Sequence, residues 1–151
     1  MDAHLHRALP ADSELCQAIG CWPARTRDAI WRRTRTHNEL RSVLREFFPT
    51  FLVAFAGRFA LGIASAEARA VLAIAPTRTA AAKLSVGQIA AALRRTGRSR
   101  GIDQTAADQT AAEIKSALLK PQLRQPLLVE TALGKQTLVL LAALNTACAS
   151  V

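Results

Sequence analysis

The sequence predicts an all-α protein in which two long antiparallel helices, packed like a coiled coil, are separated by a smaller helical insert. Alanine, the strongest helix former, accounts for about a fifth of the 151 residues, whereas aromatic residues account for 5%. Half of the residues are hydrophobic, which is enough for a buried core. This composition argues against a β-sandwich or a β-barrel.

Four segments are expected along the chain. They are a flexible N-terminal tail, a long arginine-rich helical region, a small helical subdomain, and a connector with a long C-terminal helix, at residues 1–12, 13–48, 49–121 and 122–151. In the second segment Gly20 and Pro23 are expected to weaken or kink the helix, because proline lacks the amide N–H. The uninterrupted helical pattern therefore covers Ala24–Phe48.

Both long helices carry residues at the alternating spacing of three and four that is typical of a packing seam. In the first helix this seam consists of Ile30, His37, Leu40, Leu44, Phe47 and Phe51, although Arg33 interrupts it and Pro49 ends the helix. In the last helix, expected from Leu127 to about Cys148, the seam consists of Leu138, Leu141, Asn145 and Cys148. We interpret both seams as surfaces for helix packing.

Capping residues divide the middle of the chain into short helices. The expected helix starts are Ser65, Thr77 or Thr79, the capping box of Ser85 and Gln88, and Asp103. The expected ends are Pro76, Leu84, Gly97 and Pro121. The pentapeptide DQTAA occurs twice in the last of these helices, over residues 103–107 and 108–112. Because five residues turn a helix by about 140° net, the second copy is expected to face a different way.

The charge of the chain indicates an anionic partner. The net charge is +9 and the pI is near 11.0, which favours nucleic acid first and a membrane surface second. The longest uninterrupted apolar run, Leu138–Leu144, is much shorter than the roughly 20 residues that span a bilayer. The first residues also lack the pattern of a signal peptide. We therefore expect a cytoplasmic protein with no membrane partner.

Two clusters of arginine are the candidate sites for DNA or RNA. The first, in the long N-terminal helix, comprises Arg25, Arg27, Arg32, Arg33, Arg35, Arg41 and Arg45. The second, at a helix end and in the loop after it, comprises Arg94, Arg95, Arg98 and Arg100. Arginine suits bidentate phosphate contacts, while a solvated helix face is the alternative for both clusters. Trp22 and Trp31 could stack on bases, but anchoring the helix to its neighbours is the favoured interpretation.

The sequence shows no arrangement typical of catalysis or of metal binding. It contains no P-loop, no H-E-x-x-H motif, no dinucleotide fingerprint and no G-x-S-x-G elbow. Cys16 and Cys21 could join His4 and His6 in a zinc site, but the C-x4-C spacing is not that of a zinc knuckle. We therefore expect no cofactor, no metal ligand and no catalytic residue in this chain.

The order of several segments resembles that of insertion-sequence transposases of the one-ten (DEDD) type, relatives of the Piv and MooV invertases. Asp12–Phe55 contains Asp-Ser-Glu, then Arg33-Thr34-Arg35, and then the pattern Asn-x-Leu-Arg-Ser-x-Leu-Arg-Glu ahead of Phe-Phe-Pro. The later segments that resemble the family are Val71–Ser85, Gln88–Arg98, Ser116–Pro126 and Leu138–Asn145. The resemblance covers nearly the whole chain.

This resemblance implies the helical and coiled-coil region of such a transposase, which serves assembly and nucleic-acid contact. The family's acidic metal ligands and its recombination serine match no position here, so no catalytic residue is carried over and divalent metal is expected only in a catalytic domain outside this chain. The expected function is that of a truncated transposase that self-associates through its helical seams, and whether the chain has any activity is left open. The alternative is an autonomous basic helical module that binds nucleic acid or protein.

Overall fold

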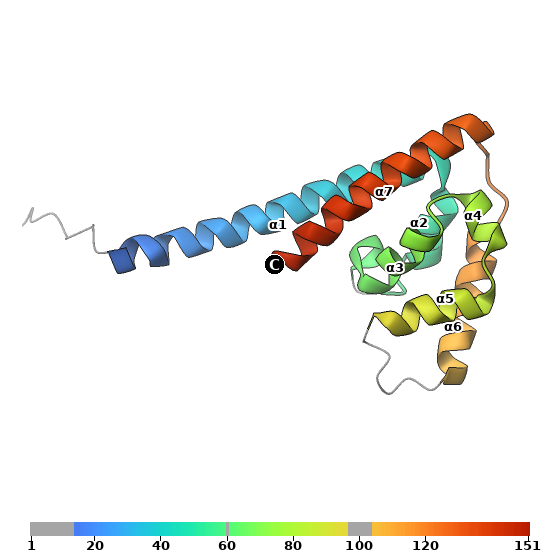
Figure 1. Ribbon diagram of the computed structural model, residues 1–151, viewed down its shortest axis with the longest axis horizontal. Coiled ribbons are helices and arrows are strands. Elements are labelled where there is room, and N and C mark those ends of the chain that lie inside the picture. Colours follow the sequence, from blue (N-terminus) through green and yellow to red (C-terminus); the bar gives the residue numbers. More distant parts are fainter. Residues whose placement is uncertain (1–13, 60, 97–103) are drawn as a thin grey trace, which may run out of the picture.

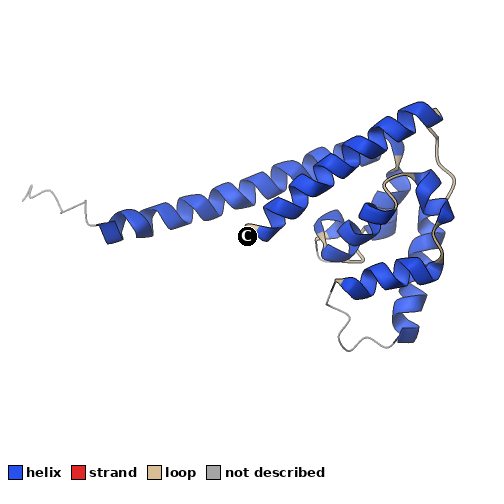
Figure 2. Cartoon of the chain, in the orientation of Figure 1, coloured by secondary structure: helices blue, strands red, loops and turns tan. Residues whose placement is uncertain are grey.

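The computed structural model describes residues 14–59, 61–96 and 104–151, without the side chains of residues 14–19, 21, 22 and 104. Every regular element in these ranges is helical, which confirms the predicted all-α class (Figure 2). The elements are α1 (Glu14–Phe47), α2 (Pro49–Phe55), the 3-10 helix η2 (Gly62–Ala64), α3 (Ala66–Ile74), α4 (Arg78–Lys83), α5 (Val86–Arg95), α6 (Gln104–Leu118) and α7 (Leu127–Ala149).

The two longest helices, α1 and α7, lie side by side and run in opposite directions (Figure 1). The shorter helices α2 to α6 gather at the end where α1 finishes and α7 begins. The N-terminal part of α1 extends beyond the last turn of α7, so this part of the helix has no neighbour along its side in Figure 1.

Gly20 and Pro23, which were expected to weaken or kink the helix, do not end it, because α1 is helical through both residues. Proline removes one hydrogen bond of the helix and crowds the preceding turn. Gly20 and Pro23 are both exposed. Water can therefore reach the carbonyl that loses its partner, and the helix continues.

The predicted seam of α1 is correct near its C-terminal end. Leu40, Leu44 and Phe47 are fully buried, whereas Ile30 is 40% exposed and His37 is half-buried. At 100° per residue, His37 and Ile30 lie about 60° and 80° around the helix from Leu40, toward the edge of the buried face. The predicted spacing therefore extends beyond the residues that are fully buried.

The seam predicted for α7 is partly wrong. Leu141 is buried and Cys148 is half-buried, but Leu138 and Asn145 are exposed, and the Asn145 Oδ1 accepts a hydrogen bond from the Arg69 guanidinium at 2.7 Å. The buried stripe of α7 is instead Glu130, Gly134, Thr137, Leu141, Leu144 and Ala147. Four of these six residues are not large apolar ones, so hydropathy alone does not mark the stripe.

A row of phenylalanines forms the centre of the core where α1 meets α2. Phe47, Phe48, Phe51 and Phe55 are buried, and successive ring centroids lie 6.2, 5.6 and 4.7 Å apart. Pro49 ends α1 and begins α2, so the row passes from one helix to the next. These contacts join the long helix to the small helical group.

The predicted caps of the short helices are largely confirmed. Ser65 and Thr77 accept hydrogen bonds from backbone amides at the starts of α3 and α4, and Ser85 and Gln88 form a complete capping box at α5. The expected cap at Asp103 and stop at Gly97 lie outside the described residues.

The DQTAA repeat in α6 shows the expected change of face. Ala107 in the first copy is buried while its counterpart Ala112 is exposed, and Ala106 is exposed while its counterpart Ala111 is buried. The second copy therefore buries the other member of its alanine pair.

The helix α7 leaves much apolar surface exposed on the side away from the core. By length and composition alone it is apolar enough to cross a membrane, a test that the core helix of a soluble protein also passes. Lys135 and the threonines of this helix divide it into short apolar runs, so no single run in the sequence is long enough to span a bilayer. The exposed side includes Leu128, 83% exposed, and Val139, 70% exposed.

Candidate nucleic-acid interface

The regular turn of α1 divides the predicted arginine cluster between two flanks. At 100° per residue, Arg27, Arg41 and Arg45 fall within about 40° of one another on one flank. Arg25 and Arg32 fall about 20° apart on the other flank. The two remaining members are Arg35, which lies toward the outward ridge between the flanks, and Arg33, which shares the direction of the buried Leu40.

The arginines of α1 are accessible with one partial exception. Arg33 is half-buried, and the other six are exposed. On α1 the Arg35 Nε forms an ion pair with the Glu39 carboxylate at 3.1 Å, and both groups face solvent. Six of the seven guanidinium groups are thus exposed to solvent, where an anion can reach them.

Trp31 was expected to anchor α1 to its neighbouring helices, and this expectation is wrong. Its side chain is 76% exposed, and it lies on the outward ridge of α1. A surface hollow of about 530 Å³ adjoins it, lined by Ile30, Trp31, Thr34, Arg35, Asn38 and Glu39. The side chain of Trp22 is not among those described.

His37 lies on the inner edge of the arginine cluster. Burial, together with the positive charges of Arg41 and Arg33, lowers the pKa of His37 below its usual value. The imidazole is therefore neutral near pH 7. With Arg41 it borders a small cavity of about 230 Å³ whose other walls are apolar, among them Phe55 and Ile63. The charges of Arg41 and Arg33 make the local potential positive, which favours an approaching anion.

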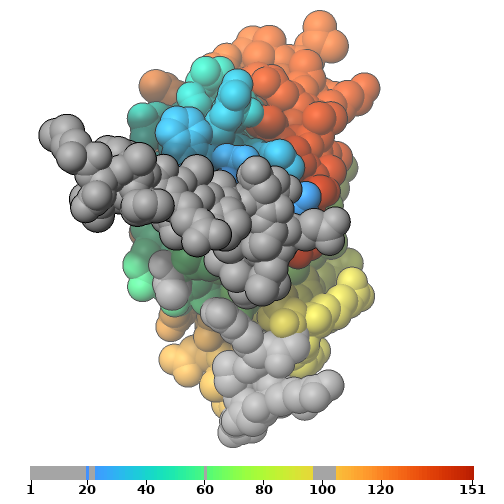
Figure 3. Space-filling model, turned by 90° about the vertical axis from the view of Figure 1, so that its left-hand side faces the viewer, coloured from blue at the N-terminus to red at the C-terminus, as the bar shows by residue number. Residues whose placement is uncertain are grey.

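The second predicted cluster lies away from the first. Arg94 and Arg95 end α5 and are exposed, whereas Arg98 and Arg100 lie outside the described residues. In Figure 1, α2 and α3 lie between α5 and the long helices. Figure 3, which views the molecule from the N-terminal end of α1, shows the yellow α5 below the red α7. The structure therefore does not bring Arg94 and Arg95 onto the α1 surface.

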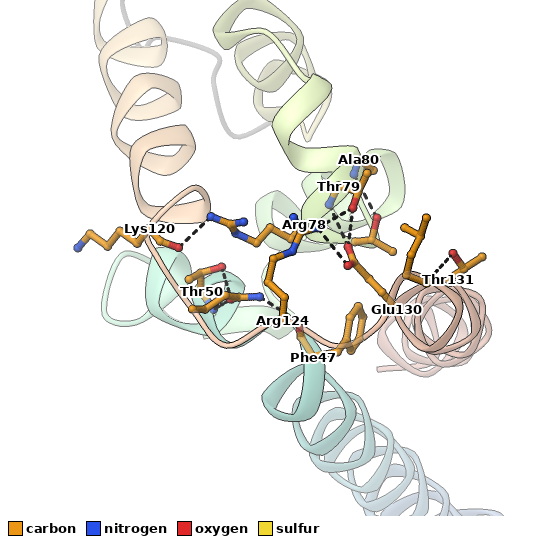
Figure 4. Close-up of polar contacts among 12 residues, drawn as sticks. Phe47, Thr50, Arg78, Thr79, Ala80, Lys120, Arg124, Glu130 and Thr131 are labelled. Atoms are coloured by element: carbon orange, nitrogen blue, oxygen red, sulfur yellow. Dashed lines mark hydrogen bonds and ion pairs between the residues drawn. The ribbon is translucent and has the colours of Figure 1, made fainter.

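The position of α7 beside α4 depends on a buried carboxylate that the sequence analysis missed. Glu130 is 3% exposed, and its Oε1 accepts hydrogen bonds from the amide and hydroxyl of Thr79 at 3.1 and 2.8 Å. The Arg124 guanidinium donates to the Glu130 Oε2 at 3.2 Å (Figure 4). Burial opposes ionisation of Glu130, but these three partners outweigh it and hold the pKa of Glu130 below its usual value.

The described side chains offer no arrangement for a metal ion. Among them, no three His, Cys, Asp or Glu residues gather closely enough to hold one. His4 and His6 lie outside the described residues, as do the side chains of Cys16 and Cys21.

Comparison with known proteins gives one informative match. Over 147 residues the chain is 40% identical to a protein of Streptomyces coelicolor named "Mini-circle putative transposase for IS117". The chain is similar to part of a transposase. The match covers 97% of this chain but spans about a third, 34%, of the IS117 protein. No protein-family model and no solved structure matches the chain.

Proposed function

We propose that this chain is the helical region of an insertion-sequence transposase that contacts nucleic acid and mediates assembly. The observation that carries the proposal is the exposed arginine surface of α1, in a chain that is 40% identical to part of a transposase. We further propose that the transposase is of the one-ten (DEDD) type and that the chain is cytoplasmic. We assign no catalytic residue to this region and expect divalent metal to act in a domain outside it.

Phosphate contact is supported by the number and the position of the charges. Six exposed arginines follow α1, five on its two flanks and Arg35 toward the ridge between them. The acidic residues of the same stretch are Asp28, Glu39 and Glu46. A helix with this imbalance can follow a phosphate backbone on either side of its outward ridge. Binding of this kind releases counterions and weakens steeply as the salt concentration rises.

The test is an affinity measurement by fluorescence anisotropy with labelled DNA and RNA at about 50 and about 300 mM salt. We expect a large loss of affinity between the two conditions. Replacing the arginines of one flank with glutamine should lower the affinity by about tenfold or more and flatten the salt dependence. One variant changes Arg27, Arg41 and Arg45 of the first flank, and the other changes Arg25 and Arg32 of the second flank together with Arg35 of the adjoining ridge.

A matched control removes three charges elsewhere, at Lys83, Lys115 and Lys120. If the control weakens binding as much as either flank variant does, net charge rather than the α1 surface is responsible. An affinity that is the same at both salt concentrations would show that phosphate contact is wrong.

Assembly is supported by the outward side of α7. Exposed residues there alternate at spacings of four and three, which is the repeat of a packing seam: Leu128, Ala132, Lys135, Val139, Ala142, Thr146 and Ala149. A second helix can pack closely where the residues are small. We therefore assign self-association to this outward side of α7. The inner side of α7 makes the contact with α1.

The second candidate function is that of an autonomous basic helical module that binds nucleic acid or protein. The phenylalanine core favours this candidate, because it is buried by residues of this chain alone. Phe47, Phe48, Phe51 and Phe55 are buried within this chain alone. A core of this kind predicts cooperative unfolding without further domains. A monodisperse monomer that unfolds in one transition would favour this candidate over the transposase region.

A further inference from the structure

The indole of Trp31 is unusually placed for a large aromatic side chain. It is 76% exposed, although tryptophan side chains are mostly buried in folded proteins. Arg27 precedes it by four residues and Arg35 follows it by four, so each lies one turn away, at about 6 Å along the helix axis. The aromatic face is thus bordered by a cation on either side.

Further polar groups adjoin the indole on the same ridge. The hollow beside it is lined by side chains that include Thr34, Asn38 and Glu39, and it measures about 530 Å³. Asn38 is exposed two turns along from Trp31 and has both a donor and an acceptor. This surface offers an aromatic face, hydrogen-bonding groups and cations within three turns of one helix.

We propose that Trp31 is a stacking platform for an unpaired base of single-stranded nucleic acid, with Arg27 and Arg35 on the adjoining phosphates. In a duplex the faces of the bases are covered by their neighbours, whereas an unpaired base can stack on an exposed aromatic ring. The positive charge on both sides of the ring complements a phosphate backbone and favours this ligand over an apolar protein surface. The inference rests on the proposed function and narrows its ligand to a single strand.

The test uses the full chain with Trp22→Phe, so that Trp31 is the one remaining tryptophan. Short oligouridylate and oligothymidylate are compared with a duplex of equal length, by anisotropy and by quenching of the Trp31 fluorescence. We expect quenching by the single strands, and a loss of single-strand affinity of about fivefold or more in Trp31→Ala. Trp31→Phe should retain most of the affinity, because a phenyl ring also stacks.

A matched control is Val53→Ala, which removes an exposed apolar side chain on α2, outside the α1 and α7 surfaces, and should leave the affinity unchanged. If the chain binds nucleic acid with the expected salt dependence but Trp31→Ala binds single strands as tightly as before, the stacking proposal is overturned and the proposed function stands. Equal quenching by duplex and single strand also overturns it. A chain that binds no nucleic acid overturns both, and a change confined to the oligomeric state of Trp31→Ala identifies a protein contact instead.

Discussion

The carboxylate of Glu130 on α7 accepts two hydrogen bonds from Thr79 in the first turn of α4, one from the amide at 3.1 Å and one from the hydroxyl at 2.8 Å. Arg124, in the connector before α7, donates to the same carboxylate and also to the Thr79 hydroxyl. One buried acid therefore joins the last helix to the small helical group.

Replacing Glu130 with glutamine should lower the free energy of unfolding by about 1–3 kcal/mol near pH 7, since bonds to a charged group are lost in a buried site. Urea unfolding followed by circular dichroism measures the change. Glu39→Gln is the matched control, because Glu39 pairs with Arg35 in solvent and should contribute less than about 0.5 kcal/mol.

The loss of unfolding free energy in Glu130→Gln should depend on pH. The pKa of Glu130 is lower in the folded chain than in the unfolded one, so its stabilisation is complete above the usual glutamate pKa of about 4.3 and is lost as the pH falls through the folded value. The gap in unfolding free energy between the wild type and Glu130→Gln should thus narrow in acid. A gap that stays constant from neutral pH to about pH 3 would contradict the assignment.

Gly134→Ala should destabilise the chain although alanine favours helix. A Cβ at Gly134 would lie 2.5 Å from the Thr77 Cγ2, and Thr77 is not free to rotate because its hydroxyl caps α4 through the Ala80 amide. We expect a net loss of about 1–3 kcal/mol in unfolding free energy.

Two further variants test this explanation. Adding Thr77→Ser to Gly134→Ala removes the clashing methyl but keeps the cap, so most of the stability should return. Gly87→Ala in α5, where the nearest atom is the Ser85 Oγ at 3.8 Å, should instead stabilise by up to about 1 kcal/mol. A failure of Thr77→Ser to restore stability would exclude the clash as the cause.

Gln122→Ala should lower the unfolding free energy by about 1–2 kcal/mol. The Gln122 amide donates to the Phe47 carbonyl at 3.0 Å and accepts from the Thr50 amide at 3.2 Å, so it satisfies backbone groups at the break between α1 and α2. Gln125→Ala is the control, since its bond to the Glu46 carbonyl is longer, at 3.3 Å, and exposed. Equal effects of the two variants in thermal unfolding would argue against the bridging role.

The outward side of α7 predicts self-association. Leu128→Gln combined with Val139→Gln should shift the chain toward the monomer, because a helix pair would then bury polar groups. Sedimentation velocity over a range of protein concentrations measures this shift. Val53→Gln on α2, where the side chain is 59% exposed, should leave the oligomeric state as it is. A wild-type chain that is monomeric at all concentrations would contradict self-association through this surface.

Local sequence signals predicted much of the fold. The alanine content and the apolar spacing predicted helices, and the caps at Ser65, Thr77 and Ser85 predicted where three of them begin. These features depend on residues within one or two turns, so they can be derived without knowledge of neighbouring helices. The arginine cluster of α1 was likewise visible in the sequence, although whether it binds nucleic acid stays a prediction.

Tertiary structure decided what the local pattern could not. Trp31 is exposed because it lies on the side of α1 opposite the buried Leu40, and which side of α1 is covered depends on where the other helices pack. Glu130 and Gly134 form part of the buried stripe of α7 because Thr79 and Thr77, more than 50 residues earlier, meet them there. The composition and the spacing thus determined the helices and their charge. The contacts between distant segments determined which faces are buried and which remain open to a partner.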